Sequence, residues 1–498
     1  MKRIVKFETV EKFDLSADVV VCGYGGAGGC AALEARRAGA DVLILERSSG
    51  AGGSTMMSAC EMFLGGSGGT RLQRDLGFSE TTENFYAYLK ACFGDNWDEA
   101  RVRVFVDNAA AHFDWMEQLG VVYKRGFYPG RDVVAMTGDS LQYTGNEQSY
   151  PFNGAAVPTP HGHLPADANH EGGLRVMAAL SARVTESGVR TQIDTRALQL
   201  IQDEQGRVRG VVARQFGRDQ FIEARRGVVL TTGGFVMNEA MTRKHIPSLD
   251  AIALRHGNPG DMGDGILMGV AAGGQAINMG EAFVGVAHYP PAQLTFGIFV
   301  NAAGQRFINE DIYLARLGHY IHQQPDERVY LFIDNKHFDR PAYIQTEIVA
   351  VGDSVEEVER EAGLPAGSLR QTVAYYNEHA ARGEDPLYHK SREYLAALDT
   401  PPYALTSYKL SELRPPVFTL GGLDVRPTGE VLDPDGDIIP GLYAAGRTVA
   451  GIPRTSKGYA SGMSVADVTL FGRLAGRQAA QSWRAIDATT AATRRPML

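Results

Sequence analysis

Short apolar runs alternate with helix-like segments along the first half of the chain. The runs at residues 19–22, 42–45 and 227–232 are almost wholly apolar, which is typical of strands buried on both faces of a parallel sheet. Shorter strands are predicted between residues 192 and 224. Apolar positions with helical spacing predict helices at residues 29–38, 80–119, 172–186 and 461–483. Strands that alternate with helices in this way indicate an α/β fold.

The pattern changes between residues 281 and 415. This part has aromatic strands and charged helices, predicted at residues 297–300, 329–333, 355–362 and 368–382. The glycine-rich, strand-and-turn pattern returns after residue 416. A chain of 498 residues is also too long for one ordinary core. We therefore predict a discontinuous Rossmann-like domain, formed by residues 1–280 and 416–498, with an inserted α+β cap domain at residues 281–415.

A glycine-rich turn joins the first two apolar runs. It reads Gly23-Tyr24-Gly25-Gly26-Ala27-Gly28, and Glu46 ends the second run. Gly23 permits the tight turn, Gly25 lets the backbone approach a pyrophosphate, and Gly28 lets the next helix pack against the strand. The helix N-terminus offers N–H groups to phosphates, and Glu46 lies where a carboxylate accepts ribose hydroxyls. The spacing predicts dinucleotide binding, and the alternative is a glycine-rich βα turn without a ligand.

A long loop of small residues follows Glu46. It contains the stretch Gly50-Ala51-Gly52-Gly53-Ser54-Thr55 and a second glycine patch at residues 65–69. A nicotinamide-binding unit normally continues directly into another helix and strand, so this interruption favours a more extended cofactor such as FAD. The 58 glycines also cluster at residues 257–274 and 441–462, which suggests that backbone approaches a ligand at several places.

Composition narrows the class of protein further. The formal net charge is −9 with dispersed basic residues, which gives no indication of nucleic-acid binding. No apolar run approaches about 18 residues, so no transmembrane segment is expected. Residues 1–14 lack a signal-peptide core, and four cysteines without metal spacing are expected to be reduced thiols in a cytoplasmic protein. No metal is expected.

Residues 121–168 form an irregular segment rich in Gly, Pro, Tyr and His. We predict a lobe or loop near the substrate. His161 and His163 lie in this segment without a carboxylate or cysteine at metal-ligand spacing. Histidines in such a loop are typical of the protein surface, and we expect both of them there.

The chain resembles the flavoprotein group of fumarate reductases and 3-ketosteroid dehydrogenases over nearly its whole length. Besides the Gly23 to Glu46 fingerprint, the motifs that carry the resemblance are Gly52-Gly53-Ser54-Thr55, Thr232-Gly233-Gly234-Phe235, Gly263-Asp264-Gly265, Gly304-Gln305-Arg306-Phe307-Ile308-Asn309-Glu310 and Pro440-Gly441-Leu442-Tyr443-Ala444-Ala445-Gly446. The resemblance implies non-covalent FAD and a cap that closes a substrate cleft over the flavin ring. The implied cofactor-binding residues are Gly23, Gly25, Gly26, Ala27, Gly28, Glu46, Arg47, Gly52, Gly53, Ser54, Thr55, Thr232, Gly233, Gly234, Asp264, Gly446, Gly462 and Ser464.

Two details of the sequence distinguish branches of this group, and by them the chain resembles the 3-ketosteroid Δ4-dehydrogenases. Fumarate-type reductases carry Asn-Arg-Leu-Gly after the Ala-Ala-Gly, where this chain has Arg447-Thr448-Val449-Ala450 and continues to Arg454. The stretch Gly458-Tyr459-Ala460-Ser461-Gly462 has the Tyr-x-Ser-Gly form of the Δ4-dehydrogenases, and Tyr313 follows the Asn-Glu motif. Those enzymes introduce a C4–C5 double bond into a saturated 3-ketosteroid. The resemblance implies a steroid substrate and an electron acceptor that the sequence does not identify.

The resemblance assigns Tyr459, Ser461 and Tyr313 to catalysis. A 3-keto group acidifies the C4 hydrogen, and Tyr459 is the candidate base. A phenol has an ordinary pKa of about 10, so its anion must be favoured. Ser461 and the start of the helix near it would provide that help, and Tyr313 would complete a relay or polarise the carbonyl. The alternative interpretation is that Tyr459 packs on the helix and Ser461 is an N-cap.

Other functions remain open from the sequence alone. A fumarate- or urocanate-like reductase would need a cationic carboxylate site, to which Arg316 and Arg454 would contribute. A 3-ketosteroid Δ1-dehydrogenase differs in the carbon pair that faces the flavin, and a flavin-free NAD-binding protein is of another class. Arg306 with Glu310 is expected to form a structural ion pair, and His288 is expected to be a packing residue.

Overall fold

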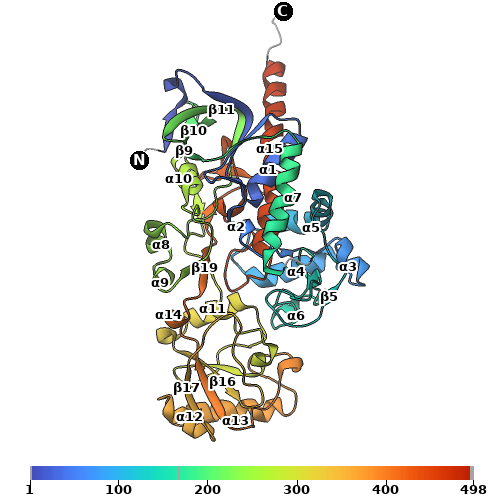
Figure 1. Cartoon of the computed structure of the whole chain (residues 1–498), viewed down its shortest axis with the longest axis vertical. Helices are drawn as coiled ribbons and strands as arrows, with labels where there is room; N and C mark the ends of the chain where they lie inside the picture. The colour runs from blue at the N-terminus through green and yellow to red at the C-terminus, as the bar shows by residue number, and fades with distance from the viewer. Residues whose placement is uncertain (1–2, 167–168, 494–498) are drawn as a thin grey trace, which may run out of the picture.

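The largest sheet of the described chain carries the glycine-rich turn. The computed structural model describes residues 3–166 and 169–493, and Figure 1 shows this sheet in the upper part of the molecule. Its strands run in the order β1-β9-β10-β11-β2-β3-β8, with β22 beside β11 and β21 beside β22. The bounds are β1 (Ile4–Lys6), β2 (Leu15–Cys22), β3 (Val42–Leu45), β8 (Arg190–Gln192), β9 (Thr195–Gln202), β10 (Val208–Gln215), β11 (Arg218–Leu230), β21 (Glu430–Leu432) and β22 (Ile438–Ala444).

Strand β2 has parallel neighbours on both sides. It pairs with β3 and with β11, and β11 pairs in parallel with β22. The third apolar run therefore returns to the sheet that carries the glycine turn, as predicted. The prediction of separate strands at residues 220–224 and 227–232 is wrong, because β11 is continuous and only shifts register between Ala224 and Gly227. A Cβ at Gly227 would lie 2.7 Å from the Tyr443 ring, so glycine permits the approach of β22.

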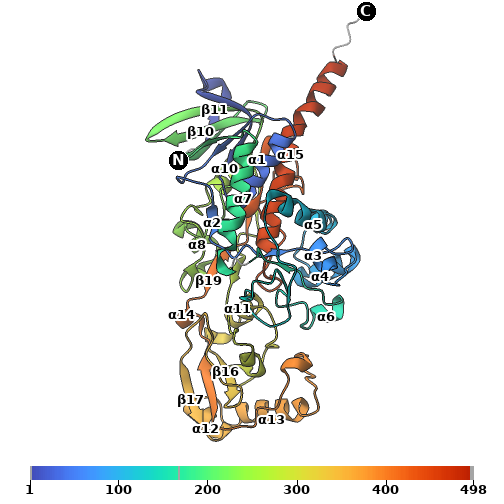
Figure 2. The same ribbon diagram turned by 45° about the vertical axis from the view of Figure 1, so that its right-hand side comes forward.

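Helices α1 (Gly26–Arg37), α7 (Gly172–Glu186) and α15 (Met463–Thr493) pack together beside this sheet (Figures 1 and 2). Buried Val19 and Val21 of β2 belong to the same apolar core as these helices. A Cβ at Gly476 of α15 would lie 2.0 Å from the Ala31 oxygen of α1, so the two helix backbones are in close contact. Helix α7 has the predicted bounds, whereas α15 begins at Met463 rather than at 461.

The predicted helical stretch at residues 80–119 consists of two helices, α4 (Thr82–Phe93) and α5 (Glu99–Leu119). Gly94 ends α4 with a φ of +55°, and the Asp98 side chain caps α5 by accepting from the Arg101 N–H (2.9 Å). The mainly irregular segment that follows contributes to a small sheet. Its strands and the neighbouring short helices are β4 (Met62–Phe63), β5 (Phe127–Tyr128), β6 (Leu141–Gln142), β7 (Gly162–His163), α2 (Gly53–Met56), α3 (Arg71–Asp75) and α6 (Phe152–Ala155).

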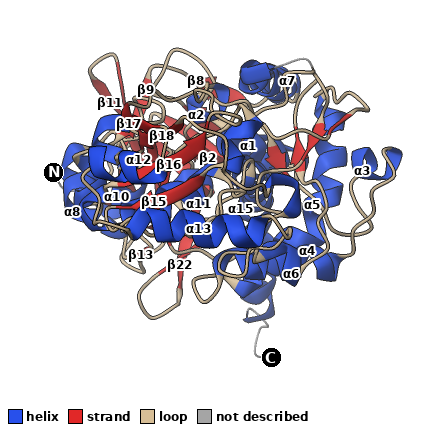
Figure 3. Ribbon diagram, turned by 90° about the horizontal axis from the view of Figure 1, so that it is seen from below, coloured by secondary structure: helices blue, strands red, loops and turns tan. Residues whose placement is uncertain are grey.

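A second lobe forms the lower part of the molecule in Figure 1 and faces the viewer in Figure 3. Its sheet has the order β15-β16-β18-β17, and buried side chains of α12 and α13 pack against it. The bounds are β15 (Ile298–Asn301), β16 (Val329–Asp334), β17 (Ile348–Gly352), β18 (Tyr403–Ser407), α11 (Leu314–His322), α12 (Val355–Glu361), α13 (Ser368–Ala380) and α14 (Leu410–Leu413). The aromatic strands and charged helices predicted here are thus present.

Short elements join the two parts. The chain runs into the lower lobe after β14 and leaves it through β19, and these two strands pair antiparallel. The two passages therefore lie side by side, while the exact division at residues 281 and 415 stays a prediction. The short elements of this region are β12 (Leu254–Arg255), β13 (Ala276–Ile277), β14 (Ala282–Val284), β19 (Pro416–Thr419), β20 (Gly422–Leu423), α8 (Glu239–His245) and α9 (Pro247–Asp250). Helix α10 (Asp264–Ala271) packs on β9 of the large sheet. Across residues 3–166 and 169–493, no helix combines the length and apolarity needed to cross a membrane.

Candidate active site

An open cleft of about 830 Å³ lies at the carboxyl ends of β2, β3 and β11, beside the N-terminus of α1. Open α/β sheets bind ligands at this edge. Predicted cofactor-binding residues from distant stretches of the chain meet on its wall: Gly23, Gly25, Gly26, Ala27, Glu46, Arg47, Gly53, Ser54, Thr55, Thr232, Gly233, Asp264 and Gly446.

The glycine turn has the shape that a pyrophosphate requires. Gly23 has a φ of +108°, and a Cβ there would lie 2.4 Å from the Thr231 oxygen. A Cβ at Gly28 would lie 1.9 Å from the Gly23 oxygen, whereas a Cβ at Gly25 would meet nothing closer than 3.8 Å. The N-cap residue of α1, Gly25, has no side chain, and Thr55 Oγ1 accepts a hydrogen bond from the Gly26 N–H (3.2 Å). The other N–H groups at the start of the helix remain for an anion. The turn therefore fits the diphosphate of a dinucleotide.

Glu46 follows β3 directly and is 7% exposed. Its Oε2 accepts a hydrogen bond from the Tyr24 N–H (2.6 Å), and its Oε1 accepts one from the Ser48 N–H (2.7 Å). An ionised carboxylate has about four lone-pair sites. Both oxygens thus keep capacity for ribose hydroxyls, and the two backbone bonds fix the carboxylate on the cleft wall.

The remaining predicted cofactor residues lie around this cleft without lining it. Gly28 packs α1 against the turn, and the Gly52 oxygen lies 3.8 Å from the Cβ position of Gly25. A Cβ at Gly234 would lie 2.7 Å from Thr419 Oγ1, and one at Gly462 would lie 2.7 Å from the Phe63 nitrogen. Each of these two glycines therefore permits a close approach of protein atoms on the side where a side chain would stand. Ser464 lines a smaller adjoining cavity of about 250 Å³.

Asp264 is ion-paired although it reaches the cleft. It is the first residue of α10, and its carboxylate lies 3.1 Å from Arg3 Nη1 and 2.7 Å from Arg196 Nη2. These two cations, together with the helix N-terminus, account for the carboxylate without a ligand. Its contact with the cofactor stays a prediction.

Arg447 lines both cavities. Its Nε is buried without a hydrogen-bond partner, and its guanidinium carbon lies 4.1 Å from the Phe418 ring centroid. Burial lowers the pKa of this guanidinium, and the charge of Asp261 opposes that shift. A buried donor of positive charge without a partner is costly. The position fits an anionic or acceptor-rich ligand such as FAD, and the sequence analysis did not assign it.

The rings of Tyr313 and Tyr459 lie close together and face each other. Tyr313 precedes α11, Tyr459 lies in the turn before α15, and each is 5% exposed. Their ring centroids are 6.2 Å apart with an interplanar angle of 20°. The Phe283 ring packs edge-on against Tyr459 at 4.9 Å. The structure thus brings together the two tyrosines that the sequence singled out.

The two hydroxyls have different neighbours. The Tyr459 hydroxyl oxygen accepts a hydrogen bond from the Ser464 N–H (3.3 Å) in the first turn of α15. Burial raises the pKa of Tyr459, whereas hydrogen bonds from Ser464 and the charge of Arg447 lower it. Burial raises the pKa of Tyr313 well above its ordinary value, and a hydrogen bond with Ser461 opposes the shift. Ser461 therefore interacts with Tyr313, while Ser464 interacts with Tyr459.

Comparison with known proteins decides the family. The model of the FAD-binding domain family matches residues 18–462. The chain belongs to this family. It is an FAD-dependent oxidoreductase of the group that contains steroid dehydrogenases and fumarate reductases.

Relatives of both kinds match the chain of this FAD-binding protein. The structure of 3-ketosteroid-Δ4-(5α)-dehydrogenase from Rhodococcus jostii RHA1, in complex with 4-androstene-3,17-dione, is 38% identical with a TM-score of 0.90, covering 96% of this chain and 99% of that one. The 3-oxo-5-alpha-steroid 4-dehydrogenase of Comamonas testosteroni is 27% identical, covering 86% of this chain and 92% of that protein. NADH:fumarate oxidoreductase of Klebsiella pneumoniae is 29% identical over 94% of this chain, which spans about half (48%) of that protein.

Glu61 lies next to the tyrosines of this FAD-dependent enzyme and was missed by the sequence analysis. It precedes β4, which is joined to the Tyr459 turn by a hydrogen bond from the Phe63 N–H to the Gly462 oxygen (3.2 Å). Glu61 Oε1 accepts from Gln142 Nε2 (2.9 Å), and Oε2 is buried without a partner. Burial raises the pKa of Glu61 to about 7, although Ser461 and Gln142 favour the charged form. No sequence motif marks this residue.

The expected surface position of His161 and His163 is wrong. His161 is 1% exposed and His163 is fully buried. His161 contacts the carboxylates of Glu80 (3.0 Å) and Glu147 (3.2 Å), and His163 contacts Thr70 Oγ1 (2.8 Å). Glu80 comes from a distant segment, and Glu147 lies 14 residues before His161 without a spacing that marks a contact, so local composition could not reveal either partner.

The remaining candidates have protein partners. Arg306 and Glu310 form the predicted ion pair at 2.7 Å. His288 is buried, and its Nε2 contacts the backbone oxygen of Glu310 (2.9 Å), which agrees with the predicted packing role. Arg454 donates to the Gly451 oxygen (3.0 Å) and lies 3.4 Å from Asp98. The Arg316 guanidinium lies near the rings of Phe152 and Tyr320, at 5.2 and 5.1 Å. Arg454 is thus ion-paired, whereas the buried Nε of Arg316 has no hydrogen-bond partner within the described chain, so only Arg454 is excluded as a free carboxylate clamp.

Proposed function

We propose that this FAD-dependent oxidoreductase is a 3-ketosteroid dehydrogenase that introduces a C4–C5 double bond into a saturated 3-ketosteroid. The observation that carries the proposal is the buried Tyr313–Tyr459 pair, which adjoins the FAD cleft through Ser464 and Arg447. The similarity to the Rhodococcus jostii Δ4-dehydrogenase over nearly both chains supports the same substrate class.

The reaction removes two hydrogens from neighbouring carbons. C4 loses a proton, C5 loses its hydrogen with the bonding electron pair, and the C4–C5 double bond forms. FAD, when bound, supplies the two-electron acceptor. The residues of the chain must hold the steroid, accept the C4 proton and stabilise negative charge on the 3-keto oxygen.

Tyr459 is the proposed base for the C4 proton. Its hydroxyl oxygen already accepts a hydrogen bond from the Ser464 N–H at the N-terminus of α15, and a donor at this place favours the phenolate. The charge of Arg447 acts in the same direction. Burial outweighs both effects and raises the pKa of Tyr459 above the ordinary value of a phenol, so formation of the phenolate depends on these donors.

Tyr313 has the complementary role of a proton donor. Burial raises its pKa well above the ordinary value of a phenol, so Tyr313 stays protonated at neutral pH. A protonated phenol beside the substrate polarises the 3-keto group or passes a proton to Ser461, with which it interacts. The pair would therefore combine a base and an acid in one buried contact.

The lower lobe is proposed to cap the substrate. Tyr313 precedes α11, whose apolar side packs with β14 and β16, and Tyr459 precedes α15 of the FAD-binding part. Substrate bound between the two tyrosines would thus contact both parts of the molecule. Residues 281–415 would act as the inserted cap, and FAD would be held without a covalent bond.

The test is anaerobic mixing of the purified yellow protein with a saturated 3-ketosteroid. We expect the flavin absorbance to bleach and a Δ4-3-ketosteroid to form. Absence of bleaching, together with reoxidation of the dithionite-reduced protein by fumarate or urocanate, would contradict the proposal and indicate a reductase.

A further inference from the structure

Asn146 joins the two tyrosines through their backbones. Its Nδ2 donates to the backbone oxygen of Tyr459 (3.0 Å), and its Oδ1 accepts from the backbone N–H of Tyr313 (2.9 Å). The side chain is fully buried. One amide group from a third segment of the chain thus fixes the segments that carry both tyrosines.

The turn that carries Asn146 also packs on the ring of Tyr313 and the hydroxyl of Tyr289. Gly145 has a φ of +107°, and a Cβ there would lie 2.9 Å from Tyr313 Cδ2 and 2.8 Å from the Tyr289 hydroxyl. Glycine is therefore required at this contact, since any side chain would displace the Tyr313 ring. The backbone of the turn and the Asn146 amide act on the same residue.

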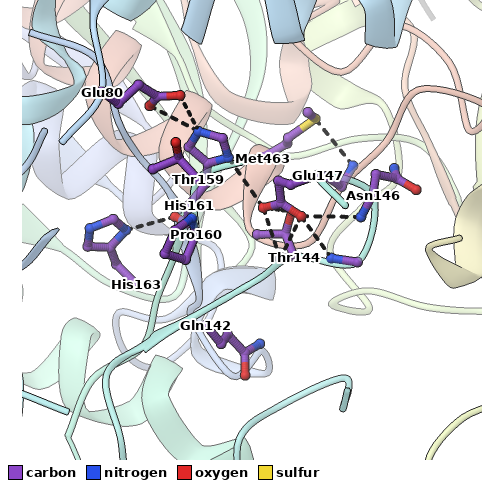
Figure 4. A network of polar contacts seen from close by, with 12 residues as sticks. Glu80, Gln142, Thr144, Asn146, Glu147, Thr159, Pro160, His161, His163 and Met463 are labelled. Atoms are coloured by element: carbon purple, nitrogen blue, oxygen red, sulfur yellow. Dashed lines mark hydrogen bonds and ion pairs between the residues drawn. The ribbon is translucent and has the colours of Figure 1, made fainter. Parts of the chain in front are cut away.

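A buried ion network holds this turn in place. Glu147 accepts from the N–H groups of Thr144 (3.0 Å), Gly145 (3.1 Å) and Asn146 (3.2 Å). Figure 4 shows His161 between Glu147 and Glu80, with Asn146 on the far side of Glu147. Burial lowers the pKa of His161, but the two carboxylates outweigh it and raise the value to about 9. His161 is therefore a cation between two anions, and the network fixes the position of the Asn146 backbone.

We propose that Asn146 is a positioning residue that sets the separation and orientation of Tyr313 and Tyr459 for proton transfer. This inference rests on the proposed function, because the tyrosine pair is its object. Asparagine suits the role because its amide offers a donor and an acceptor at once. Displacement of a reacting group by about 1 Å can cost on the order of 10²-fold in rate, so the amide has a measurable effect without touching substrate.

Two substitutions separate positioning from folding. Asn146→Ala removes both hydrogen bonds, and Asn146→Asp keeps an acceptor for the Tyr313 N–H but loses the donor to Tyr459 when ionised. Protonation of the Asp restores that donor. Asn153→Ala is the matched control, because this exposed amide on α6 donates to the Gln148 backbone oxygen (2.9 Å) beside the same turn and so loses a nearby hydrogen bond without the two contacts to the tyrosine segments. Stopped-flow flavin reduction by a saturated 3-ketosteroid gives the rate at saturation and the steroid concentration for half-saturation.

We expect Asn146→Ala to lower the saturating rate about 10- to 100-fold, with FAD content and half-saturating concentration within about 2-fold of the unmodified protein. Asn146→Asp should regain rate relative to the unmodified protein as the pH falls, and Asn146→Ala should not. The titratable groups that face this position are Glu147 on its own turn, His161 beside β7, Glu61 before β4, Tyr313 before α11 and Tyr459 before α15.

Unchanged rates in both variants would overturn the inference, as would a pH response of Asn146→Asp that matches Asn146→Ala. If the unmodified protein is not reduced by any 3-ketosteroid, the proposed function fails separately. The near-ultraviolet circular dichroism of tyrosine then tests the positioning role of Asn146. Asn146→Ala should alter that signal, while Asn153→Ala should leave it unchanged. An unaltered tyrosine signal would overturn the inference in that case too.

Discussion

The rings of Tyr313 and Tyr459 lie 6.2 Å apart and nearly parallel, although they come from distant parts of the chain. Their hydroxyls have separate partners, since Ser461 interacts with Tyr313 and Ser464 with Tyr459. Burial raises the pKa of both hydroxyls, but Ser464 at the N-terminus of α15 and the charge of Arg447 oppose the shift at Tyr459, whereas the pKa of Tyr313 lies well above its ordinary value. This asymmetry is the basis of the proposed acid and base roles.

Replacement of the Tyr459 hydroxyl tests the base. We expect Tyr459→Phe to lower the rate of flavin reduction by about 10²- to 10⁴-fold, because the phenyl ring keeps the packing against Phe283 but cannot accept a proton. Stopped-flow absorbance and FAD content are the measurements, with Tyr375→Phe on the surface of α13 as control. A variant that retains full activity would exclude Tyr459 as the base.

Removal of the Glu46 carboxylate tests the ribose contact. Hydrogen bonds to charged groups are worth about 1.5–3 kcal/mol, so Glu46→Gln should weaken FAD binding by about 10- to 100-fold. Glu46→Ala should weaken it further, because the Tyr24 and Ser48 N–H groups also lose their acceptor. Titration of the apoprotein with FAD gives the dissociation constant, and the surface variant Glu11→Ala is the control. Full FAD retention in both Glu46 variants would place the ribose contact elsewhere.

A change at Glu61 tests the electrostatics around the tyrosines. Burial is the main cause that raises the pKa of Tyr459, and the Glu61 carboxylate raises it further. Glu61→Gln removes this negative charge, so the pKa of Tyr459 should fall and the rate should rise at a lower pH than in the unmodified protein. Because burial raises the pKa of Glu61 to about 7, we expect an inflection near that pH in the unmodified protein and none in Glu61→Gln.

The measurement is the pH profile of anaerobic flavin reduction, with Glu83→Gln on the exposed side of α4 as control. A profile for Glu61→Gln that overlays the profile of the unmodified protein would contradict this account of the charge.

The network of Glu80, His161 and Glu147 should stabilise the fold in a pH-dependent way. The pKa of His161 is about 9 in the folded state, against about 6.5 in an unfolded chain. Its contribution is therefore fully present below about pH 6.5 and is lost as the pH rises through about 9. His161→Gln leaves two buried carboxylates without their shared cation, which should lower the free energy of unfolding by about 3–5 kcal/mol.

Urea unfolding at several pH values tests this prediction. The unmodified protein should lose stability between pH 6.5 and 9.5 relative to His161→Gln. His379→Gln, on helix α13, should behave like the unmodified protein because His379 contacts the backbone oxygen (2.9 Å) and the ring of Tyr375 and no carboxylate within the described chain forms an ion pair with it. Equal pH dependence in all three proteins would show that His161 is not a buried cation.

Local patterns were sufficient to predict the FAD-binding part of the fold. The β2–α1–β3 unit, the return of β11 and the bounds of α7 follow from apolar runs and helical periodicity. Glu46 and the Gly23 turn were predictable because the cofactor motif is contiguous in sequence. Tyr313, Tyr459 and Ser461 were accessible only through resemblance, since a lone tyrosine before a helix has no distinctive pattern.

The residues around the tyrosines could not be predicted from local sequence. Asn146, Glu61 and His161 derive their surroundings from segments far away in the chain. A histidine in a Pro- and Gly-rich loop resembles a surface residue until Glu80 and Glu147 are seen beside it. The interruption of β11 was also misjudged, because a register shift at Gly227 has the same local pattern as a turn.

The position of the new double bond tests the central claim most directly. The protein is incubated anaerobically with a saturated 3-ketosteroid deuterated at C5, and the product is analysed by NMR and mass spectrometry. The account predicts a C4–C5 double bond with loss of the C5 deuterium and one C4 hydrogen. A product that keeps the C5 deuterium and carries a C1–C2 double bond would contradict it and identify a Δ1-dehydrogenase.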